Sequence, residues 1–332
     1  MEKNNLIEVK NLKTYFYLDQ GVVKAVDDVS FNIKDKRSLG IIGESGCGKS
    51  VTAQSILRIV PSPPGKIVEG SINLRRLNGG IDDLVKMDPF GEEIRSIRGN
   101  DISLIFQEPM TSFGPLNTIG DQVMEVILLH NDISEDEARE RVIKMMDQVG
   151  IPKPEQRIDD YPHQFSGGMR QRAMIAMALA CSPRLLIADE PTTSVDVTIE
   201  AQVLDLLRDL QEERGMAIML ITHNLAVVSE LAHDIGVMYL GKMVENSTTE
   251  RIFNNPLHPY TKALWRSIPK LEGELERLVP IEGVVPSPFK KLQGCVFYPR
   301  CEERIDGVCN GKEFPPQVEV EPGHYVRCFK YV

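Results

Sequence analysis

Long apolar runs are absent from the 332 residues of this chain. No stretch approaches the roughly 20 consecutive apolar residues that a membrane-spanning helix requires. The first residues lead straight into a strand-like segment, without the apolar core of a secretory signal. We therefore expect the protein to stay in the cytoplasm, where its six cysteines should not form a disulfide framework.

Positive charge is also scarce. Lys and Arg total 38 against 48 Asp and Glu, which gives a formal net charge of −10. This balance disfavours a nucleic-acid partner. Internal repeats and low-complexity tracts are absent too. Hydrophobic residues make up 42% and charged residues 26%, as in an ordinary globular protein of one large domain or two.

The pattern that dominates the sequence is at residues 43–50, which read G-E-S-G-C-G-K-S and match the phosphate-binding loop G-x-x-x-x-G-K-S. A strand-like apolar run precedes this loop and a helix-like run follows it, which is the context that the motif requires. Lys49 is predicted to reach the β- and γ-phosphates of a nucleotide, and the Ser50 hydroxyl to ligate Mg²⁺. The predicted nucleotide contacts of the loop are Gly43, Ser45, Gly46, Cys47, Gly48, Lys49, Ser50 and Val51.

Short β-like runs at residues 6–9, 22–26 and 29–33 predict a small antiparallel sheet ahead of this loop. Three adjacent aromatics at residues 15–17 lie in the same region. Because side chains alternate between the faces of a strand, at least one ring should be exposed. An exposed ring could stack on adenine, and cross-strand packing is an equally good interpretation for any one of the three.

Polar residues follow three apolar, strand-like runs of the chain. Gln107, the pair Asp189 and Glu190, and His223 each stand at such a strand end. Ligands of α/β sheets bind outside the carboxyl ends of the strands. Asp189 is predicted to hold Mg²⁺ and Glu190 to polarise the attacking water. A loop position for Gln107, solvated carboxylates for the acidic pair and a structural role for His223 are the alternatives. Residues 235–239 and 243–245 are expected to form the last, edge strands.

Between these strands the pattern is helical from about Thr118 to Gly150, with a capping box that begins at Ser134. A second helix opens at Ser166 and runs to about Ala180. The two glycines after Ser166 could form a phosphate-sized nest, although a plain helix cap is the simpler interpretation of these three residues. The pattern predicts a helical insert within an α/β sheet.

Four of the six cysteines fall within the last 38 residues, in a loop-rich segment too poor in apolar residues for a sizeable core. They are Cys295, Cys301, Cys309 and Cys328. A bound metal centre could fix such a fold. Zinc sites commonly use C-x₂₋₄-C pairs, and no pair here is that close. We therefore expect a structural [4Fe–4S] cluster, which accepts wider spacing, with zinc and with free or disulfide-bonded cysteines as alternatives.

Taken in order, these motifs resemble the ATPase subunit of an ABC transporter over residues 6 to about 250. The run Ser-Gly-Gly-Met-Arg-Gln at 166–171, placed between the phosphate loop and Asp189, is highly specific to that family. The loop at 43–50, the runs Q-E-P-M-T-S at 107–112 and N-P-L-H-P-Y-T at 255–261, and the cysteine-bearing tail resemble the dipeptide/oligopeptide importer branch.

The resemblance implies an α/β fold: a P-loop NTPase core with an antiparallel β subdomain, a helical subdomain at about 110–180, and a small Cys-containing extension. It divides the chain into an ATPase domain at 1–250 and a C-terminal extension at 251–332. Phe16 matches the residue that stacks on adenine, with Tyr17 or Tyr15 as substitutes. The remaining matches are Gln107 as the residue that touches Mg²⁺ and senses the permease, Ser166 and Gly168 as contacts to ATP on the opposite subunit, Glu190 as catalytic base, Asp196 as the D-loop acid and His223 as the switch histidine.

The implied activity is ATP hydrolysis that drives peptide import. The implied partners are transmembrane permeases, a second ATPase subunit, identical or related, and indirectly an extracytoplasmic peptide-binding protein. The chain would then lie on the cytoplasmic side of the membrane. Phe113-Gly114 departs from the family pattern where permease contact is expected. An importer of nickel or another small solute is the alternative within the class, and a soluble ABC ATPase that acts on DNA or ribosomes is the alternative outside it.

Overall fold

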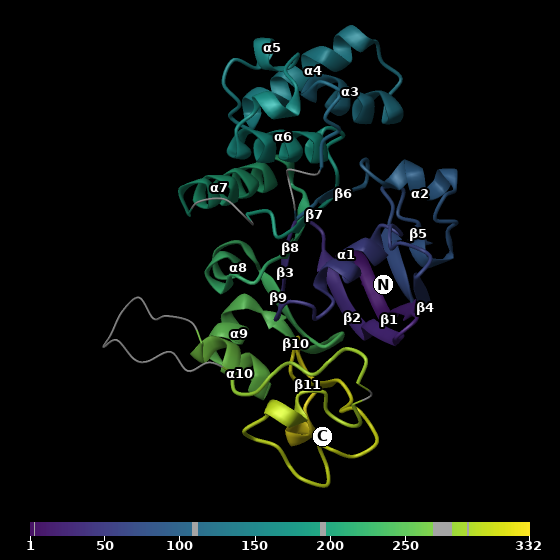
Figure 1. Cartoon of the computed structure of the whole chain (residues 1–332), viewed down its shortest axis with the longest axis vertical. Coiled ribbons are helices and arrows are strands. Elements are labelled where there is room, and N and C mark those ends of the chain that lie inside the picture. The colour runs from purple at the N-terminus through teal and green to yellow at the C-terminus, as the bar shows by residue number, and fades with distance from the viewer. Residues whose placement is uncertain (3, 108–111, 193–196, 268–280, 291) are drawn as a thin grey trace. The chain divides into compact units, whose positions relative to one another are not determined.

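The computed structural model describes residues 1–2, 4–107, 112–192, 197–267, 281–290 and 292–332, and Figure 1 traces the chain. The chain forms two compact units. The first consists of Met1–Asn32, Leu39–Val85 and Thr222–Val332, and the second of Ile33–Ser38 and Lys86–Ile221. Both ends of the chain therefore belong to the first unit.

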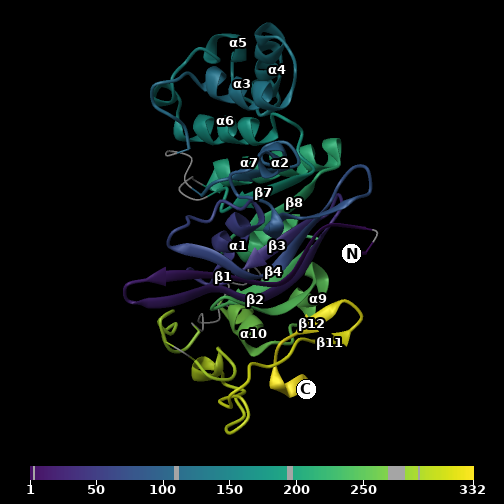
Figure 2. The same cartoon turned by 90° about the vertical axis from the view of Figure 1, so that its right-hand side faces the viewer.

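The first unit carries the expected antiparallel sheet, in the order β2-β1-β4-β5. Figure 2 labels three of its strands, β1, β2 and β4. The three predicted runs merge into two long strands of 14 residues each, because the apolar positions continue on one face of the sheet. The strands are β1 (Asn5–Leu18), β2 (Gly21–Lys34), β4 (Gly65–Arg75) and β5 (Ile81–Asp83).

The same unit holds the strand that leads into the phosphate loop, β3 (Ser38–Ile42), which is buried throughout. It pairs in parallel with β9 (Asp234–Tyr239), and β9 pairs antiparallel with β10 (Lys242–Thr248). The expectation that β9 and β10 are edge strands is wrong. The strand β9 lies between β3 and β10, and β12 (His324–Val326) of the chain's end pairs with β10.

The C-terminal extension, which we define as residues 251–332, is mostly loop. It contains α9 (Thr249–Asn254, from residue 251 on), α10 (Pro259–Arg266), the short 3-10 turns η3 (Tyr298–Arg300) and η4 (Phe329–Tyr331), and the hairpin of β11 (Val318–Glu321) with β12. The remaining helices of the first unit are α1 (Lys49–Ile56) and α8 (Leu225–Leu231). Through β12 the extension continues the sheet that contains β3, so the fold ties it to the strand before the phosphate loop.

The second unit has three parallel strands in the order β8-β7-β6 and a group of helices (Figure 1). The strands are β6 (Ile102–Ile105), β7 (Leu185–Asp189) and β8 (Ala217–Ile221). The helices are α2 (Glu92–Ile97), α3 (Ile119–His130), α4 (Glu135–Gln148), α5 (Pro154–Arg157), α6 (Gly167–Leu179) and α7 (Val197–Arg214), with the 3-10 turns η1 (Leu84–Lys86, which begins in the first unit) and η2 (Pro162–Gln164).

The helical insert forms where the sequence predicts it. Ser134 begins α4 by accepting a hydrogen bond from the Glu137 amide at 3.2 Å, as expected for an N-cap. The helices α3, α4 and α6 pack on one another. None of the described helices has both the length and the hydrophobicity needed to cross a bilayer.

Candidate nucleotide-binding site

The phosphate loop connects the buried strand β3 to the helix α1, as the motif predicts. Its conformation depends on glycines. Gly48 is the N-cap of α1 with a φ of 104°, and a Cβ there would lie 2.1 Å from the Ala25 carbonyl oxygen. A Cβ at Gly43 would lie 2.1 Å from the Met238 carbonyl oxygen. Only glycine fits at these two positions, where the loop lies directly against neighbouring backbone.

Gly46, at the outer part of the loop, has open space beside it. A Cβ built there meets no atom of the described chain within 4 Å. Ser45 beside it is exposed, and Ser50 and Val51 at the start of α1 are half-buried. The free N–H groups at the first turn of a helix attract anions. The loop therefore has an open side at Gly46, next to the first turn of α1.

Lys49 lies inside the loop rather than in solvent, with only 6% of the residue exposed. Its ammonium group donates to the Gly43 carbonyl at 2.8 Å and to the Glu44 carbonyl at 3.3 Å. Cys47 beside it is buried, and burial raises the pKa of its thiol, so it is a neutral packing residue here. The loop thus presents one buried cation to whatever anion it binds.

The three adjacent aromatics lie at the end of β1. The Tyr15 hydroxyl donates a hydrogen bond to the Asp27 carboxylate at 2.6 Å, and burial and this bond raise the pKa of Tyr15. Phe16 is half-buried opposite Gly65, at which a Cβ would come within 2.9 Å of its ring. Tyr17 is 52% exposed. Tyr15 therefore has a cross-strand hydrogen-bond partner, Phe16 is half-buried and Tyr17 is exposed.

His223 lies in the first unit just after β8, and it is exposed. The neighbouring residues hold it in a turn. The Thr222 amide donates to the Ile41 carbonyl of β3 at 3.4 Å, and Asn224 begins α8 by capping the Ala226 amide. The turn before α8 therefore places His223 beyond the carboxyl end of a strand.

Two predicted site residues meet in the second unit. The strands β6 and β7 pair in parallel with Ile105 opposite Ala188, so their carboxyl ends share one edge. At that edge the Gln107 amide donates to the Glu190 carboxylate at 3.0 Å. Asp189, the last residue of β7, is only 6% exposed. A buried carboxylate next to a hydrogen-bonded one is a suitable donor set for a divalent cation.

The backbone of Glu190 is unusual. Its φ is 48°, in the left-handed region that non-glycine residues rarely adopt, and its amide donates to the Ile221 carbonyl at 2.8 Å. Such strained positions cluster at functional sites. The backbone therefore changes direction at Glu190, directly after the last residue of β7.

Ser166 is the N-cap of α6 and accepts a hydrogen bond from the Met169 amide at 3.3 Å. Both Ser166 and Gly167 are exposed, and a Cβ at Gly167 would meet nothing within 4 Å. Gly168 packs near Ile199. The start of this helix therefore presents an open surface within its own unit. Asp196, the remaining predicted contact, lies outside the described residues.

Gln171 stood out in the sequence only as the last residue of the run 166–171, with no role of its own, yet it is fully buried on α6 and donates its side-chain amide to the Pro191 carbonyl. This bond connects the helix that Ser166 begins to the turn that follows Glu190. A polar side chain on a helix is expected to be exposed unless its hydrogen-bond partner is known. Only the fold therefore shows that Gln171 is buried.

The predicted metal centre of the tail is wrong. Cys295, Cys301, Cys309 and Cys328 are all described, yet the described part of the chain contains no group of three or more Cys, His, Asp or Glu side chains arranged to hold a metal ion. The [4Fe–4S] cluster is therefore not supported, and the zinc alternative is not supported either.

The cysteines are instead buried packing residues. Cys328 packs in an apolar cluster with Leu257 and Val326. Burial, and to a smaller extent the neighbouring thiols, raises the pKa of Cys295 to about 12 and that of Cys301 to about 11. Free cysteine is among the most buried residue types and packs as a small hydrophobe. The prediction of a metal centre failed because it took the low apolar content of this segment as a sign that the four thiols had to bind a metal.

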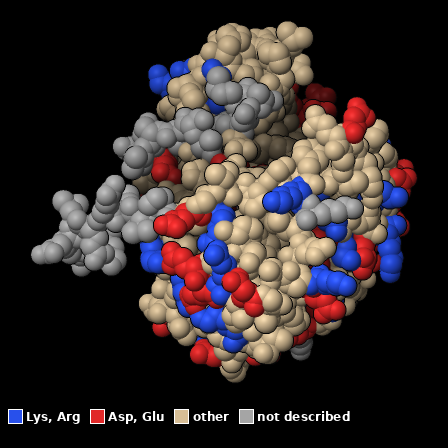
Figure 3. Space-filling view, turned by 60° about the horizontal axis from the view of Figure 1, so that its bottom comes forward, with Lys and Arg blue, Asp and Glu red and all other residues tan. Residues whose placement is uncertain are grey.

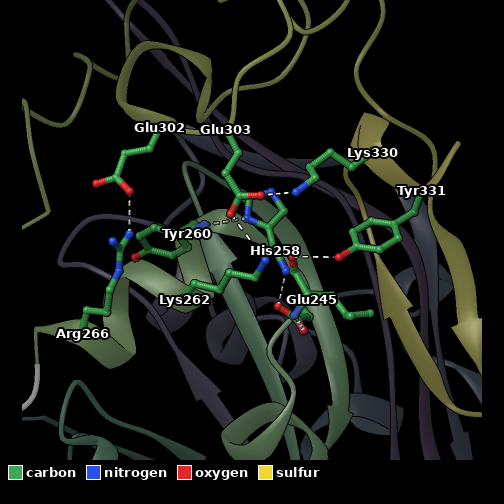
Figure 4. Close-up of polar contacts among 10 residues, drawn as sticks. Glu245, His258, Tyr260, Lys262, Arg266, Glu302, Glu303, Lys330 and Tyr331 are labelled. Carbon is green, nitrogen blue, oxygen red and sulfur yellow. Dashed lines mark hydrogen bonds and ion pairs between the residues drawn. The ribbon is translucent and has the colours of Figure 1, made fainter.

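A network of buried polar groups organises the extension (Figure 4). The Glu245 carboxylate accepts from the amides of Leu257 and His258 at 2.7 and 2.9 Å and contacts His324 at 2.8 Å. The ring of His258 accepts from the Tyr260 amide and so caps α10. Burial lowers the pKa of His258 to about 4, so its ring is neutral. This network fixes the start of α10.

On the face that carries the extension, acidic and basic side chains are interleaved (Figure 3). Lys262 and Lys330 both pair with Glu303, and Arg266 pairs with Glu302 (Figure 4). Because these opposite charges are half-buried or exposed rather than fully buried, each pair contributes little to stability. Among the described residues drawn in this view, neither sign of charge forms a patch of its own.

A strand-loop-helix phosphate loop, a carboxylate pair at the end of a buried strand and a helical insert that begins with Ser-Gly-Gly define an ATPase of the ABC type. Comparison with known proteins agrees. A family model described as ABC transporter matches residues 26–193, and a model described as oligopeptide/dipeptide transporter, C-terminal region, matches residues 244–309. The chain belongs to the ABC transporter family, as one of its ATP-binding subunits.

Relatives in that family match nearly the whole chain. The oligopeptide transport ATP-binding protein AppD of Bacillus subtilis is 47% identical over 99% of this chain and 97% of its own length. The dipeptide transport ATP-binding protein DppD of the same organism is 46% identical, over 99% and 95%. Among solved structures, the dimeric structure of the bacterial ABC transporter cassette MJ0796 is 26% identical, covers 73% of this chain and 98% of that one, and has a TM-score of 0.64. These results confirm the predicted fold class and the resemblance.

Proposed function

We propose that this chain is the subunit that hydrolyses ATP to drive the import of dipeptides or oligopeptides through membrane permeases. The observation that carries the proposal is the phosphate loop with its buried Lys49 and open space at Gly46, in a chain whose relatives are named as peptide transport ATP-binding proteins. A second solved structure of the cassette MJ0796 is named as a post-hydrolysis state bound to ADP and Pi. The match of residues 244–309 supports the peptide branch over a nickel importer.

In this proposal, the loop residues bind the triphosphate. The backbone amides of residues 43–48 and the Lys49 ammonium neutralise its negative charge, and the open side at Gly46 admits it. The contacts would come from Gly43, Ser45, Gly46, Cys47, Gly48, Lys49, Ser50 and Val51. Phe16, which is half-buried, or Tyr17, which is exposed, would stack on the adenine.

Mg²⁺ would be held by Ser50, Gln107 and Asp189, whose hydroxyl, amide and carboxylate oxygens are suitable ligands. When bound, the ion would neutralise charge that develops on the phosphates. Glu190 would act as the general base toward the attacking water, and Gln107 is already hydrogen-bonded to it. His223 would contact the γ-phosphate from the turn before α8.

Ser166 and Gly168 would contact ATP that is bound to a second ATPase subunit, since the start of α6 is open within its own unit. Asp196 would act in the same subunit contact. The partners would be that second subunit, identical or related, the permeases and, indirectly, an extracytoplasmic peptide-binding protein. The chain would lie on the cytoplasmic side of the membrane, attached to the permeases.

Uptake in cells tests the proposal directly. A strain that lacks the gene should lose uptake of radiolabelled di- and oligopeptides, and the wild-type gene should restore it. Lys49→Ala, expressed at the same level, should not restore it, because the loop then lacks its cation. Nickel uptake is measured in the same strains for comparison. Loss of nickel uptake with peptide uptake intact would instead identify the small-solute importer, and no change in either would reject transport.

A further inference from the structure

Glu44, the second residue of the phosphate loop, is held by the C-terminal extension. Its carboxylate pairs with both terminal nitrogens of Arg300, at 2.6 Å from Nη1 and 3.0 Å from Nη2. Its amide donates to the Tyr260 hydroxyl at 2.9 Å. Its carbonyl accepts from the ammonium group of Lys49 at 3.3 Å. One residue therefore connects the extension to the lysine of the loop, and all of these groups belong to the first unit.

Arg300 is itself fixed from several sides. Its side chain is 4% exposed, its Nε donates to the Glu282 carbonyl at 3.0 Å and its Nη1 to the Tyr239 hydroxyl at 3.4 Å. Burial acts to lower its pKa, but the hydrogen bonds to Glu44 and Tyr239 outweigh that effect and raise it above the ordinary value. A bidentate, mostly buried arginine–carboxylate pair is geometrically specific as well as strong.

Three fully buried aromatic residues form a cluster next to the Arg300–Glu44 pair. Tyr239 ends β9, Tyr260 lies on α10 and Phe297 precedes η3. Their ring centroids are 4.7 Å apart for Tyr239 and Tyr260, 5.2 Å for Tyr239 and Phe297, and 5.3 Å for Tyr260 and Phe297. Because Phe297 and Arg300 stand three residues apart, the aromatic cluster sets the position from which Arg300 reaches the loop.

We propose that Arg300 is a positioning residue for nucleotide binding, which holds Glu44 so that the phosphate loop is already ordered before the triphosphate enters. The inference rests on the proposed function of the loop. A glycine-rich loop loses much conformational freedom when it is ordered. A loop that the extension has ordered beforehand loses less on binding, and binds correspondingly tighter.

The matched pair of variants for the test is Arg300→Met and Arg327→Met. Arg327 is also a buried arginine of the extension and pairs with a carboxylate of the N-terminal part, Asp28, at 2.9 Å, but it does not touch the loop. The dissociation constant of a fluorescent ATP analogue with Mg²⁺ is measured on the full chain. Arg300→Met should raise it about tenfold, within the range of coupling between contacting residues. Arg327→Met should leave it within about twofold of the wild type.

A double-mutant cycle tests the pair itself. Glu44→Gln should weaken binding to a similar degree, and the double variant with Arg300→Met should bind no more weakly than either single variant. Arg300→Lys keeps the charge without the bidentate geometry and should give an intermediate value. Two results would overturn the proposal. In one, the increases in dissociation constant of the two single variants multiply in the double variant. In the other, Arg300→Met and Arg327→Met raise the dissociation constant equally. If Arg300→Met does not fold, as judged by thermal unfolding, Arg300→Lys replaces it in the comparison.

Hydrogen exchange without nucleotide separates this proposal from the function of the loop. The amide of Glu44 should exchange faster in Arg300→Met than in Arg327→Met, because the loop loses its anchor. By linkage, saturating Mg-ATP should slow exchange at residues 295–301 in the wild type. A wild-type chain that fails to bind ATP would reject the proposed function, and the exchange of Glu44 would still decide the role of Arg300. Unchanged exchange at Glu44 would reject that role.

Discussion

The side-chain amide of Gln107 donates a hydrogen bond to the carboxylate of Glu190 at 3.0 Å, across the carboxyl ends of two neighbouring parallel strands. The two residues are 83 positions apart in the chain. The bond joins the residue proposed to sense the permease to the residue proposed to act as base. A change in the position of Gln107 would therefore change the hydrogen bonding of Glu190. The bond thus provides a direct connection between the proposed permease contact and the proposed base.

The role of Glu190 can be tested by one substitution. Glu190→Gln keeps the size of the side chain and removes the base, so nucleotide affinity should be retained while turnover falls roughly 10²–10⁴-fold. ATPase activity is measured in the full transporter complex, with Glu212→Gln on the exposed side of α7 as control. Near-normal turnover in Glu190→Gln would show that another group is the base.

Association of subunits should depend on ATP. A ligand that binds the paired form better than the separate chains promotes pairing by mass action. Light scattering of Glu190→Gln with Mg-ATP, alone and mixed with a related ATPase of the same transporter, should show a dimer in at least one case. No dimer in either mixture contradicts the role proposed for the start of α6.

Ser166 and Ser134 provide a matched pair for the same question. Both are exposed N-caps, with cap bonds of 3.3 and 3.2 Å, so each Ser→Ala change should cost about 1 kcal/mol of stability. Only Ser166→Ala should also weaken ATP-dependent association, because only α6 is proposed to meet the second subunit. Equal association of both variants would limit Ser166 to its capping role.

The free energy of unfolding should decrease as the pH is lowered, because of the titration of His258 in the extension. Its pKa is lowered to about 4 by burial, against about 6.5 in an unfolded chain, so the unfolded state binds more protons in that window. The group therefore stabilises the fold above about pH 6.5. Lowering the pH from 7 to 5 should cost about 2 kcal/mol of the free energy of unfolding.

Urea unfolding at the two pH values measures this effect. His258→Asn keeps a side-chain acceptor for the Tyr260 amide but cannot titrate, so its loss of stability between pH 7 and pH 5 should be smaller by about that amount. The exposed His163 provides the control, since His163→Asn should leave the pH dependence as it is in the wild type. An unchanged slope in His258→Asn would mean that the ring is protonated in the folded state.

Cys328 tests the packing role of the tail cysteines. It lies against Leu257, Val326 and Tyr331. Cys328→Ser places a hydroxyl in that apolar cluster and should lower the free energy of unfolding by about 1–3 kcal/mol. Cys328→Ala removes one atom without adding a polar group and should cost about 1 kcal/mol. If serine is tolerated better than alanine, the surroundings of Cys328 are polar and the packing role is wrong.

The sequence by itself determined the class of this protein. The phosphate loop at 43–50, the acidic pair at 189–190 and the Ser-Gly-Gly at 166–168 depend on local backbone requirements, which are the same wherever the motif occurs. The order of these motifs, with helical periodicity between 118 and 180, was enough to predict the ABC-type fold. The positions of Gln107 and Glu190 at strand ends were also predictable, because neighbouring parallel strands have their carboxyl ends at the same edge of the sheet.

Only the tertiary structure decided what the tail does. Cys295 and Cys328 carry the same signal in the sequence whether they bind a metal or fill a core, because burial depends on residues far away in the chain. The same holds for Arg300, which is 256 residues from Glu44. A charged residue in a loop-rich segment is expected to be solvated, and nothing local indicates a buried partner. Contacts of this kind are set by how the chain folds back through β12, and no local pattern encodes them.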